Sequence, residues 1–221
     1  MGVKHRASAP APHSLGHTGH GKIHTLPQLL PGVFVVFASA QAHSGAGLCL
    51  AVKLLRALTR LDPAWHIPLD EKALRLHKTA LGQPCLILGD EPGPSLSFSR
   101  GNGNLWAAMS SKGHVGIDVA YPQEFAGDYP FARAFRPEEL DDARIFDRND
   151  LARGAALIWS AKEASVKAMG VGFNRLDPLE VRVKVPQIKK QGFPFEVSAG
   201  NRPIAAWSRT EGTGWLCLAL A

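Results

Sequence analysis

Two spacings of apolar positions recur along the chain, one with the period of a β-strand and one with the period of an α-helix. The strand-like stretches are short, and two of them indicate hairpins. They lie at 33–40, 96–110 (two strands around a Gly/Asn turn), 115–119, 179–185 and 204–220 (a closing hairpin). Helical spacing covers 48–61 and 151–169. We therefore expect an α+β fold.

The two predicted helices differ in the residues around them. The helix at 48–61 has a basic stripe made of Lys53, Arg56 and Arg60. The helix at 151–169 has the clearer periodicity. Gly170 and Gly172 should end it, because glycine readily adopts the conformation found at helix C-termini.

A weak internal repeat relates the two halves of the chain. Short motifs recur at an offset of 109 residues: Phe98-Ser99-Arg100 with Trp207-Ser208-Arg209, Gly103 with Gly212, and Trp106 with Trp215. The same offset places the second helix on the first, with Lys162 on Lys53. We expect two similar α+β halves, 26–112 and 113–221, related by a pseudo-twofold axis. Coincidence among so few identities is the alternative.

The first 25 residues lack apolar periodicity and are rich in Ala, Pro, Gly, Ser and His. We expect residues 1–25 to be disordered or loosely attached. They hold five of the nine histidines, whose spacing fits no zinc-binding template. No apolar stretch approaches the roughly 20 residues needed to cross a bilayer, and no signal core is visible. The expectation is a cytoplasmic protein with no membrane partner.

Charge is distributed unevenly between the two halves. Residues 1–112 carry 11 basic and 5 acidic residues, whereas 113–221 carry 14 of each, so the first half holds the whole net charge of +6. A basic half indicates an anionic partner, which can be a nucleic acid, an acidic protein or a phosphorylated small molecule, unless it serves solubility alone. The three cysteines are far apart and are expected to be reduced thiols.

Two short motifs carry candidate chemistry near the middle of the chain. Asp118 lies within an apolar strand (GIDV, 116–119), where a buried carboxylate needs a cation, donors or a metal. The alternative is an Asp that caps a turn at the strand end. Ser99 and Arg100 precede a Gly-rich turn, and an Arg beside a hydroxyl can hold a phosphate. An ordinary β-turn would give the same pattern.

A third motif, WSAKEASVK, spans residues 159–167 of the second predicted helix. Trp159, Glu163 and Lys167 recur every four residues and therefore share one face of that helix. The simpler interpretations are a Glu-to-Lys surface pair, or a core aromatic beside a solvated stripe of charge.

Taken together, the motifs resemble the 4′-phosphopantetheinyl transferase superfamily, in its monomeric two-half class that includes the surfactin-synthetase activator. In order they are GQP (82–84), SFSR (97–100), GIDV (116–119), FRPEE (135–139), WSAKEASVK (159–167) and GVGF (170–173). The most specific are GID and WSxKExxxK, separated by roughly 40 residues. The resemblance covers about residues 45–221 and agrees with the internal repeat, since that class is described as a pseudo-dimer.

The resemblance implies a magnesium-dependent enzyme that moves the 4′-phosphopantetheine arm of coenzyme A onto a serine of an apo acyl or peptidyl carrier protein. Asp118 and Glu163 would be the Mg²⁺ ligands, and Glu163 would be the general base. Lys167 would act in catalysis and also face the phosphates. The residues expected to contact coenzyme A are Lys53, Arg56, Ser99, Arg100, Lys162 and Lys167.

Three positions depart from the pattern of this family. Arg100 stands where members usually have His, although Arg can also bind a phosphate. Gln83 replaces the Lys that many members have in the GKP motif. Ala120 stands where many members of the class have a second acid, which leaves fewer metal ligands and makes water the expected substitute.

These departures keep a second interpretation open, a non-catalytic homologue that binds coenzyme A or a carrier. A third interpretation is a basic nucleic-acid-binding protein. No recognition motif supports it, and aromatic residues are not interleaved with the basic ones. The interpretation favoured here is a monomeric enzyme whose partners are coenzyme A and a carrier protein, with no nucleic acid partner.

Overall fold

The computed structural model describes residues 21–26, 29–65, 73–147, 150–185 and 192–221. Within these ranges the chain forms three α-helices and three β-sheets, which confirms the predicted α+β class. Residues 1–20 of the segment predicted to be loosely attached lie outside the described residues. The end of that segment forms a short strand, β1 (His24–Thr25), which pairs with β2 (Val35–Gln41) and so belongs to the first sheet.

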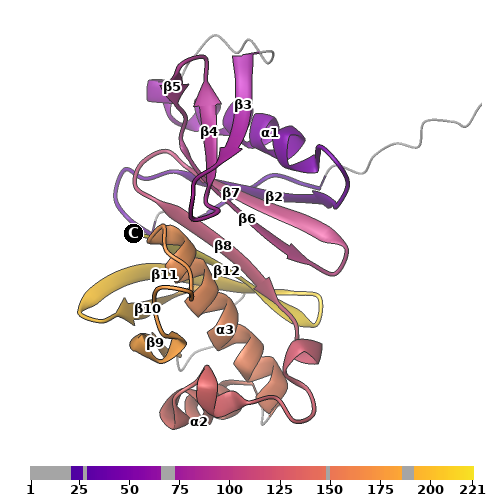
Figure 1. Ribbon diagram of the computed structural model, residues 1–221, viewed down its shortest axis with the longest axis vertical. Coiled ribbons are helices and arrows are strands. Elements are labelled where there is room, and N and C mark those ends of the chain that lie inside the picture. The colour runs from indigo at the N-terminus through magenta and orange to yellow at the C-terminus, as the bar shows by residue number, and fades with distance from the viewer. Residues whose placement is uncertain (1–20, 27–28, 66–72, 148–149, 186–191) are drawn as a thin grey trace, which may run out of the picture.

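The first half is built around an antiparallel sheet with the strand order β1-β2-β7-β6. Helix α1 packs on this sheet, and a smaller sheet with the order β3-β4-β5 lies beside the helix (Figure 1). The bounds of these elements are α1 (Ala46–Leu61), β3 (Leu74–Lys78), β4 (Pro84–Leu88), β5 (Glu91–Pro92), β6 (Ser95–Gly101) and β7 (Asn104–Ser110).

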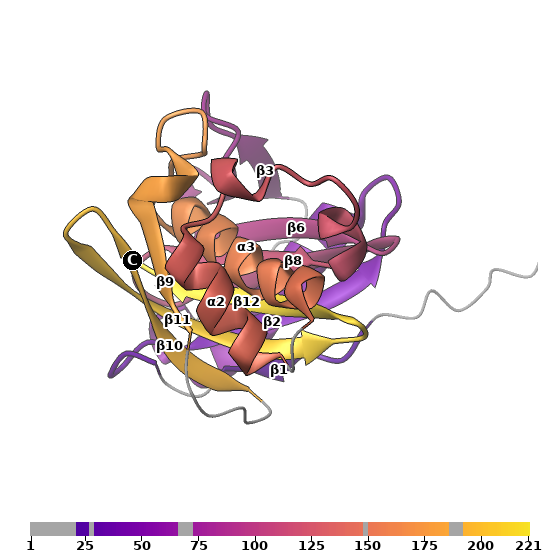
Figure 2. The ribbon, with the colours of Figure 1, turned by 90° about the horizontal axis from the view of Figure 1, so that it is seen from below.

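The second half is built around a sheet with the strand order β8-β12-β11-β10-β9. Helix α3 runs across one face of it with α2 alongside (Figure 2). None of the helices in the described ranges is long and apolar enough to cross a membrane. The bounds are β8 (Val115–Ala120), α2 (Pro137–Phe146), α3 (Leu151–Ala168), β9 (Val181–Lys184), β10 (Phe193–Ala199), β11 (Arg202–Glu211) and β12 (Gly214–Leu220).

The order of elements is alike in the two halves. If β1 and α2 are set aside, each half has a strand, then a helix that packs on it, and later a hairpin whose last strand pairs with that strand. These elements are β2, α1, β6 and β7 in the first half, and β8, α3, β11 and β12 in the second. The two hairpin turns contain Gly103 and Gly212, which both have positive φ and which the repeat in the sequence had aligned.

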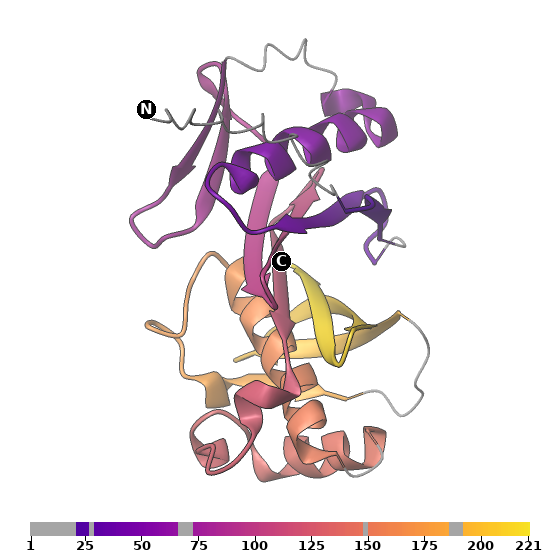
Figure 3. The ribbon, with the colours of Figure 1, turned by 90° about the vertical axis from the view of Figure 1, so that its right-hand side faces the viewer.

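The core is arranged in four layers, α1, first sheet, second sheet and α3 (Figure 3). Alternate strand residues point to opposite sides, so each sheet presents an apolar face both to its helix and to the other sheet. In β2, Val36 packs toward α1 while Phe37 packs between the sheets. In β8, Ile117 packs between the sheets, which turns its neighbour Asp118 toward α3.

Besides stacking face to face, the two sheets are joined along one edge, where the edge strand β6 lies against the edge strand β8. Three serines at alternate positions of β6 each accept a backbone N–H from β8. The pairs are Val115 to Ser95 at 3.0 Å, Ile117 to Ser97 at 3.1 Å, and Val119 to Ser99 at 3.2 Å. The serine oxygens thus accept backbone N–H groups of β8 that would otherwise need the carbonyl groups of a neighbouring strand. We call Ser95, Ser97 and Ser99 the serine ladder.

Gly116 allows α3 to approach β8 closely. A Cβ at this position would lie 1.8 Å from the carbonyl oxygen of Ala164 and 2.7 Å from the amide nitrogen of Ala168. Both atoms belong to the backbone of α3, so neither can move without the helix. The close approach brings Lys167 of α3 within 2.7 Å of Asp118, two residues further along β8.

We expect Gly116→Ala to lower the free energy of unfolding by about 3 kcal/mol, because helix and strand must separate to admit the methyl group. Urea unfolding followed by fluorescence measures this. Gly47→Ala in α1 is the control, since its Cβ would meet only side chains, the nearest being Leu76 at 3.4 Å. Unchanged stability of Gly116→Ala would contradict the close packing of α3 on β8.

Candidate functional site

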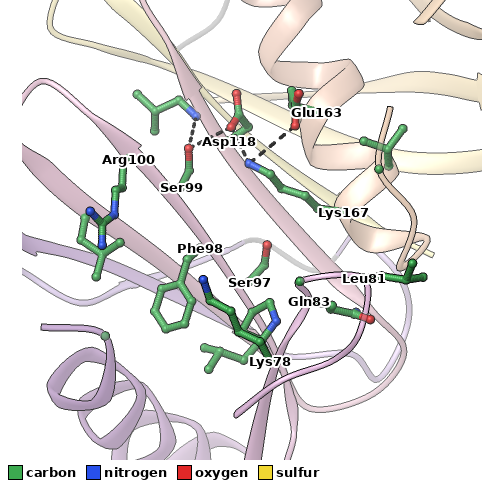
Figure 4. Close-up of a pocket in the computed structure, with 18 of the residues that line it drawn as sticks. Lys78, Leu81, Gln83, Ser97, Phe98, Ser99, Arg100, Asp118, Glu163 and Lys167 are labelled. Carbon is green, nitrogen blue, oxygen red and sulfur yellow. Dashed lines mark hydrogen bonds and ion pairs between the residues drawn. The ribbon is translucent and has the colours of Figure 1, made fainter. Parts of the chain in front are cut away.

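A cavity of about 860 Å³ opens between the two halves. The first half contributes the turn before α1, the β3–β4 hairpin and β6. The second half contributes β8, α3 and the loop that follows α3 (Figure 4). Its volume falls within the range of pockets that bury a small ligand or cofactor.

Two carboxylates and one ammonium meet on the second-half wall of this cavity. Lys167 Nζ lies 2.7 Å from Asp118 Oδ1 and 3.8 Å from Glu163 Oε2. Glu163 and Lys167 are one helical turn apart on α3, while Asp118 comes from β8. The shared helix face predicted for Trp159, Glu163 and Lys167 is confirmed, because all three line the cavity.

Ser99 connects this cluster to the first half. Its Oγ donates to Asp118 Oδ1 at 2.8 Å and accepts the N–H of Val119 at 3.2 Å. Both Ser99 and Asp118 are buried, with 7% of each residue exposed. Figure 4 shows Ser99, Asp118, Glu163 and Lys167 gathered together, with Lys78 and Gln83 of the first half across from them.

Burial dominates the electrostatics of the two acids. It raises the pKa of Asp118, although the charge and hydrogen bond of Lys167, and the bonds from Ser99 and Val119, act in the opposite direction. Burial also raises the pKa of Glu163, opposed by Lys167 and reinforced by the negative charge of Asp118. The largest cause is the same in both acids: a carboxylate removed from water is harder to ionise.

The two acids form a site that suits a hard divalent cation. The buried Asp118 carboxylate already has the Lys167 ammonium beside it, which shows that it attracts positive charge. Mg²⁺ is usually held by one or two carboxylates, with water and substrate phosphates completing its shell. Across the described residues no group of three or more His, Cys, Asp or Glu side chains is arranged to hold a metal. Asp118 and Glu163 are side chains of the kind and number that Mg²⁺ commonly takes from a protein.

The sequence-based prediction that Lys162 contacts the phosphates of coenzyme A is wrong. Its side chain is fully buried and does not line the cavity. Lys162 Nζ donates to Glu139 Oε2 at 2.7 Å and to the carbonyl oxygens of Ala134 and Pro178, each at 2.9 Å. Lys162 and Glu163 are successive helix residues and so point about 100° apart, which turns Lys162 toward α2.

The basic stripe of α1 also lies away from the cavity, contrary to the sequence interpretation. Lys53 Nζ donates to the carbonyl oxygen of Gly21, and neither Lys53 nor Arg56 is among the residues that line the cavity. Helix α1 packs its apolar face on the first sheet, so only its N-terminal end, at Gly45 and Gly47, reaches the cavity.

The cationic residues on the first-half wall are Arg100 of β6 and Lys78 of β3. Arg100 was predicted from its motif, whereas Lys78 and the neighbouring His77 were missed. The sequence did contain a signal for Lys78. It lies five residues before Gln83, the position at which many members of the family have a Lys that is missing here. The β3–β4 hairpin folds back on itself and places both residues on the cavity wall.

The three departures from the family pattern lie at different depths. Arg100 and Gln83 line the cavity. Ala120 is completely buried in the core beneath α3 and cannot reach a ligand. Glu124, which the sequence interpretation did not consider, lines the cavity and accepts the N–H of Tyr121 at 2.8 Å.

A comparison with protein families places part of the chain among known proteins. Residues 114–219 match the family model of the 4′-phosphopantetheinyl transferase superfamily. The matched region runs from β8 to β12 and contains Asp118, Glu163 and Lys167. No match was found among curated proteins. The resemblance seen in the motifs is therefore confirmed for the second half of the chain, and it supports a transferase.

Proposed function

We propose that this protein transfers the 4′-phosphopantetheine group of coenzyme A to a serine hydroxyl of an apo carrier protein and releases adenosine 3′,5′-bisphosphate. The observation that carries the proposal is the meeting of Asp118, Glu163 and Lys167 on the wall of a cavity between the two halves. Basic side chains on the opposite wall suit a ligand rich in phosphate.

Glu163 is the group proposed to take the proton of the carrier serine, because its carboxylate faces the cavity and its pKa is raised by burial. The serine oxygen then forms a bond to the phosphorus of the phosphopantetheine arm. The bond from that phosphorus to the bridging oxygen breaks, and its electron pair leaves with the adenosine bisphosphate. Asp118 and Glu163 would hold Mg²⁺, which supplies positive charge to the pyrophosphate oxygens.

Lys167 contributes a fixed positive charge between the two carboxylates. It is held at Asp118 and also donates to the carbonyl oxygen of Ile117 at 3.3 Å. An ammonium fixed in this way can meet a phosphate oxygen without first being oriented. Arg100 is the proposed contact for a phosphate on the first-half wall, since it lines the cavity and is exposed.

We further propose that the two halves are related by a pseudo-twofold axis, as in the monomeric two-half class. The like order of strand, helix and hairpin in each half supports this. The cavity at the joint would then be complete within one chain. The proposed partners are coenzyme A and an acyl or peptidyl carrier protein, in the cytoplasm.

The test is intact-mass spectrometry of several apo carrier proteins incubated with this protein, coenzyme A and Mg²⁺. We expect one carrier to gain about 340 Da, the mass of one phosphopantetheine arm, and EDTA to abolish the gain, as expected of a magnesium site that handles phosphates. If no carrier gains mass although coenzyme A binds, the protein is a non-catalytic binding homologue.

Asp118→Asn should raise the Mg²⁺ concentration needed for half-maximal activity by about tenfold or more, because the amide keeps the shape of the carboxylate but loses its charge. A titration of the transfer rate with Mg²⁺ measures the effect. Asp90→Asn is the control, since Asp90 is fully exposed on the β4–β5 turn. An unchanged Mg²⁺ requirement in Asp118→Asn would remove Asp118 from the ligand set.

A further inference from the structure

The serine ladder contains one member that differs from the others. Ser95, Ser97 and Ser99 all accept a backbone N–H of β8 through Oγ, at 3.0–3.2 Å. Among the described residues, Ser99 is the one member whose hydroxyl also donates to a side chain, namely to Asp118 Oδ1 at 2.8 Å. Ser97 is the matched control for Ser99, because it lies two residues away on the same strand, is buried and also lines the cavity.

A hydroxyl has a single proton, so it can donate only one hydrogen bond at a time. The Ser99 proton is directed at Asp118, and one of its lone pairs receives the N–H of Val119. A phosphate oxygen only accepts hydrogen bonds and would need that same proton. Ser99 therefore serves Asp118 or a phosphate, but not both, and in this arrangement it serves Asp118.

The bonds to Asp118 are unequal between its two oxygens. In the described parts of the chain, the side chains of Ser99 and Lys167 both donate to Oδ1 of this carboxylate. Two side-chain donors on one oxygen restrict the rotation of the carboxylate. Such outer contacts commonly set how well a metal-binding side chain is oriented.

We propose that Ser99 is a positioning residue for Asp118 rather than a contact for the 3′-phosphate of coenzyme A. Its hydroxyl links β6 of the first half to the carboxylate in the second half. It thereby sets the orientation in which Asp118 binds a divalent cation. This inference rests on the proposed function only in its choice of cation site.

Metal binding without any carrier protein provides the first test. Mn²⁺ stands in for Mg²⁺, and its free concentration is followed by electron paramagnetic resonance. We expect Ser99→Ala to raise the Kd for Mn²⁺ about tenfold, the usual effect of losing a partner of a metal ligand. Ser97→Ala should change it less than about twofold, since this variant loses the same kind of backbone bond but not the bond to Asp118. Ser99→Thr keeps the hydroxyl and should restore the affinity.

Binding of coenzyme A and of 3′-dephospho-coenzyme A provides the second test. A positioning residue predicts that Ser99→Ala changes both affinities by the same factor. A selective loss for coenzyme A would show that Ser99 contacts the 3′-phosphate, which would overturn the inference. Equal effects of Ser99→Ala and Ser97→Ala on Mn²⁺ binding would also overturn it, because the ladder would then be structural alone.

The outcome for the proposed function is separate from the outcome for Ser99. If the unaltered protein binds Mn²⁺ in a way that depends on Ser99 but modifies no carrier, the inference stands and the transferase proposal fails. If the unaltered protein binds no Mn²⁺, the inference is wrong whatever the protein does to carriers.

Discussion

Replacement of Glu163 by Gln is expected to lower the turnover of carrier modification by about two to four orders of magnitude, because an amide cannot accept the serine proton. The substitution keeps the shape of the side chain and, with it, the packing of α3. Single-turnover mass spectrometry at saturating coenzyme A measures the rate directly. A rate equal to that of the unaltered protein would show that Glu163 is not the base.

The same variant must be distinguished from the loss of a metal ligand. If turnover recovers as Mg²⁺ is raised, Glu163 acts by holding the cation, and another group takes the proton. A loss that persists at saturating Mg²⁺ supports the base. Glu138→Gln is the matched control, since Glu138 is exposed on α2 and does not line the cavity.

The second large effect is expected at Glu139, which partners the buried Lys162. Glu139→Ala should lower the free energy of unfolding by about 3–5 kcal/mol, the usual result of leaving a buried charge without its partner. The variant also removes the acceptor for the N–H groups of Arg136 and Val183, at 2.9 and 2.8 Å. Denaturant unfolding measures the loss.

Lys162→Met distinguishes a structural lysine from a phosphate ligand. If Lys162 serves only the core, this variant should lower stability while the affinity for coenzyme A changes little in the protein that remains folded. Combining it with Glu139→Gln should be less damaging than Glu139→Ala, because no buried charge is then left alone. A large loss of coenzyme A affinity at full stability would contradict the structural role of Lys162.

Elements with strong periodicity could be predicted from the sequence, and weakly patterned ones could not. The predicted stretches at 33–40 and 151–169 appear as β2 and α3 with ends shifted by a few residues. The sequence interpretation missed α2 and the strands β1, β3, β4, β5 and β10. Helix α2 has few apolar positions, and its stability comes from Pro137 at its start and from the packing of Glu139, Ala143 and Phe146.

The residues of the candidate site also divide into those that a local pattern predicts and those that depend on the fold. Glu163 and Lys167 were predictable because their spacing along one helix determines a shared face. Lys162 was not, since its partner Glu139 is 23 residues away and only the fold brings them together. The bond from Ser99 to Asp118 likewise depends on how β6 lies against β8, which no local pattern records.

The apolar layer between the two sheets has a consequence for folding. Phe37 and Trp106 from the first half pack there with Ile117 and Leu218 from the second. If the halves were cut apart, each would expose that layer, and β8 would present an unpaired edge ready to join another chain. We therefore expect the region matched to the family not to fold on its own. The halves should unfold together in one cooperative transition, so a truncation in either half should abolish both folding and coenzyme A binding.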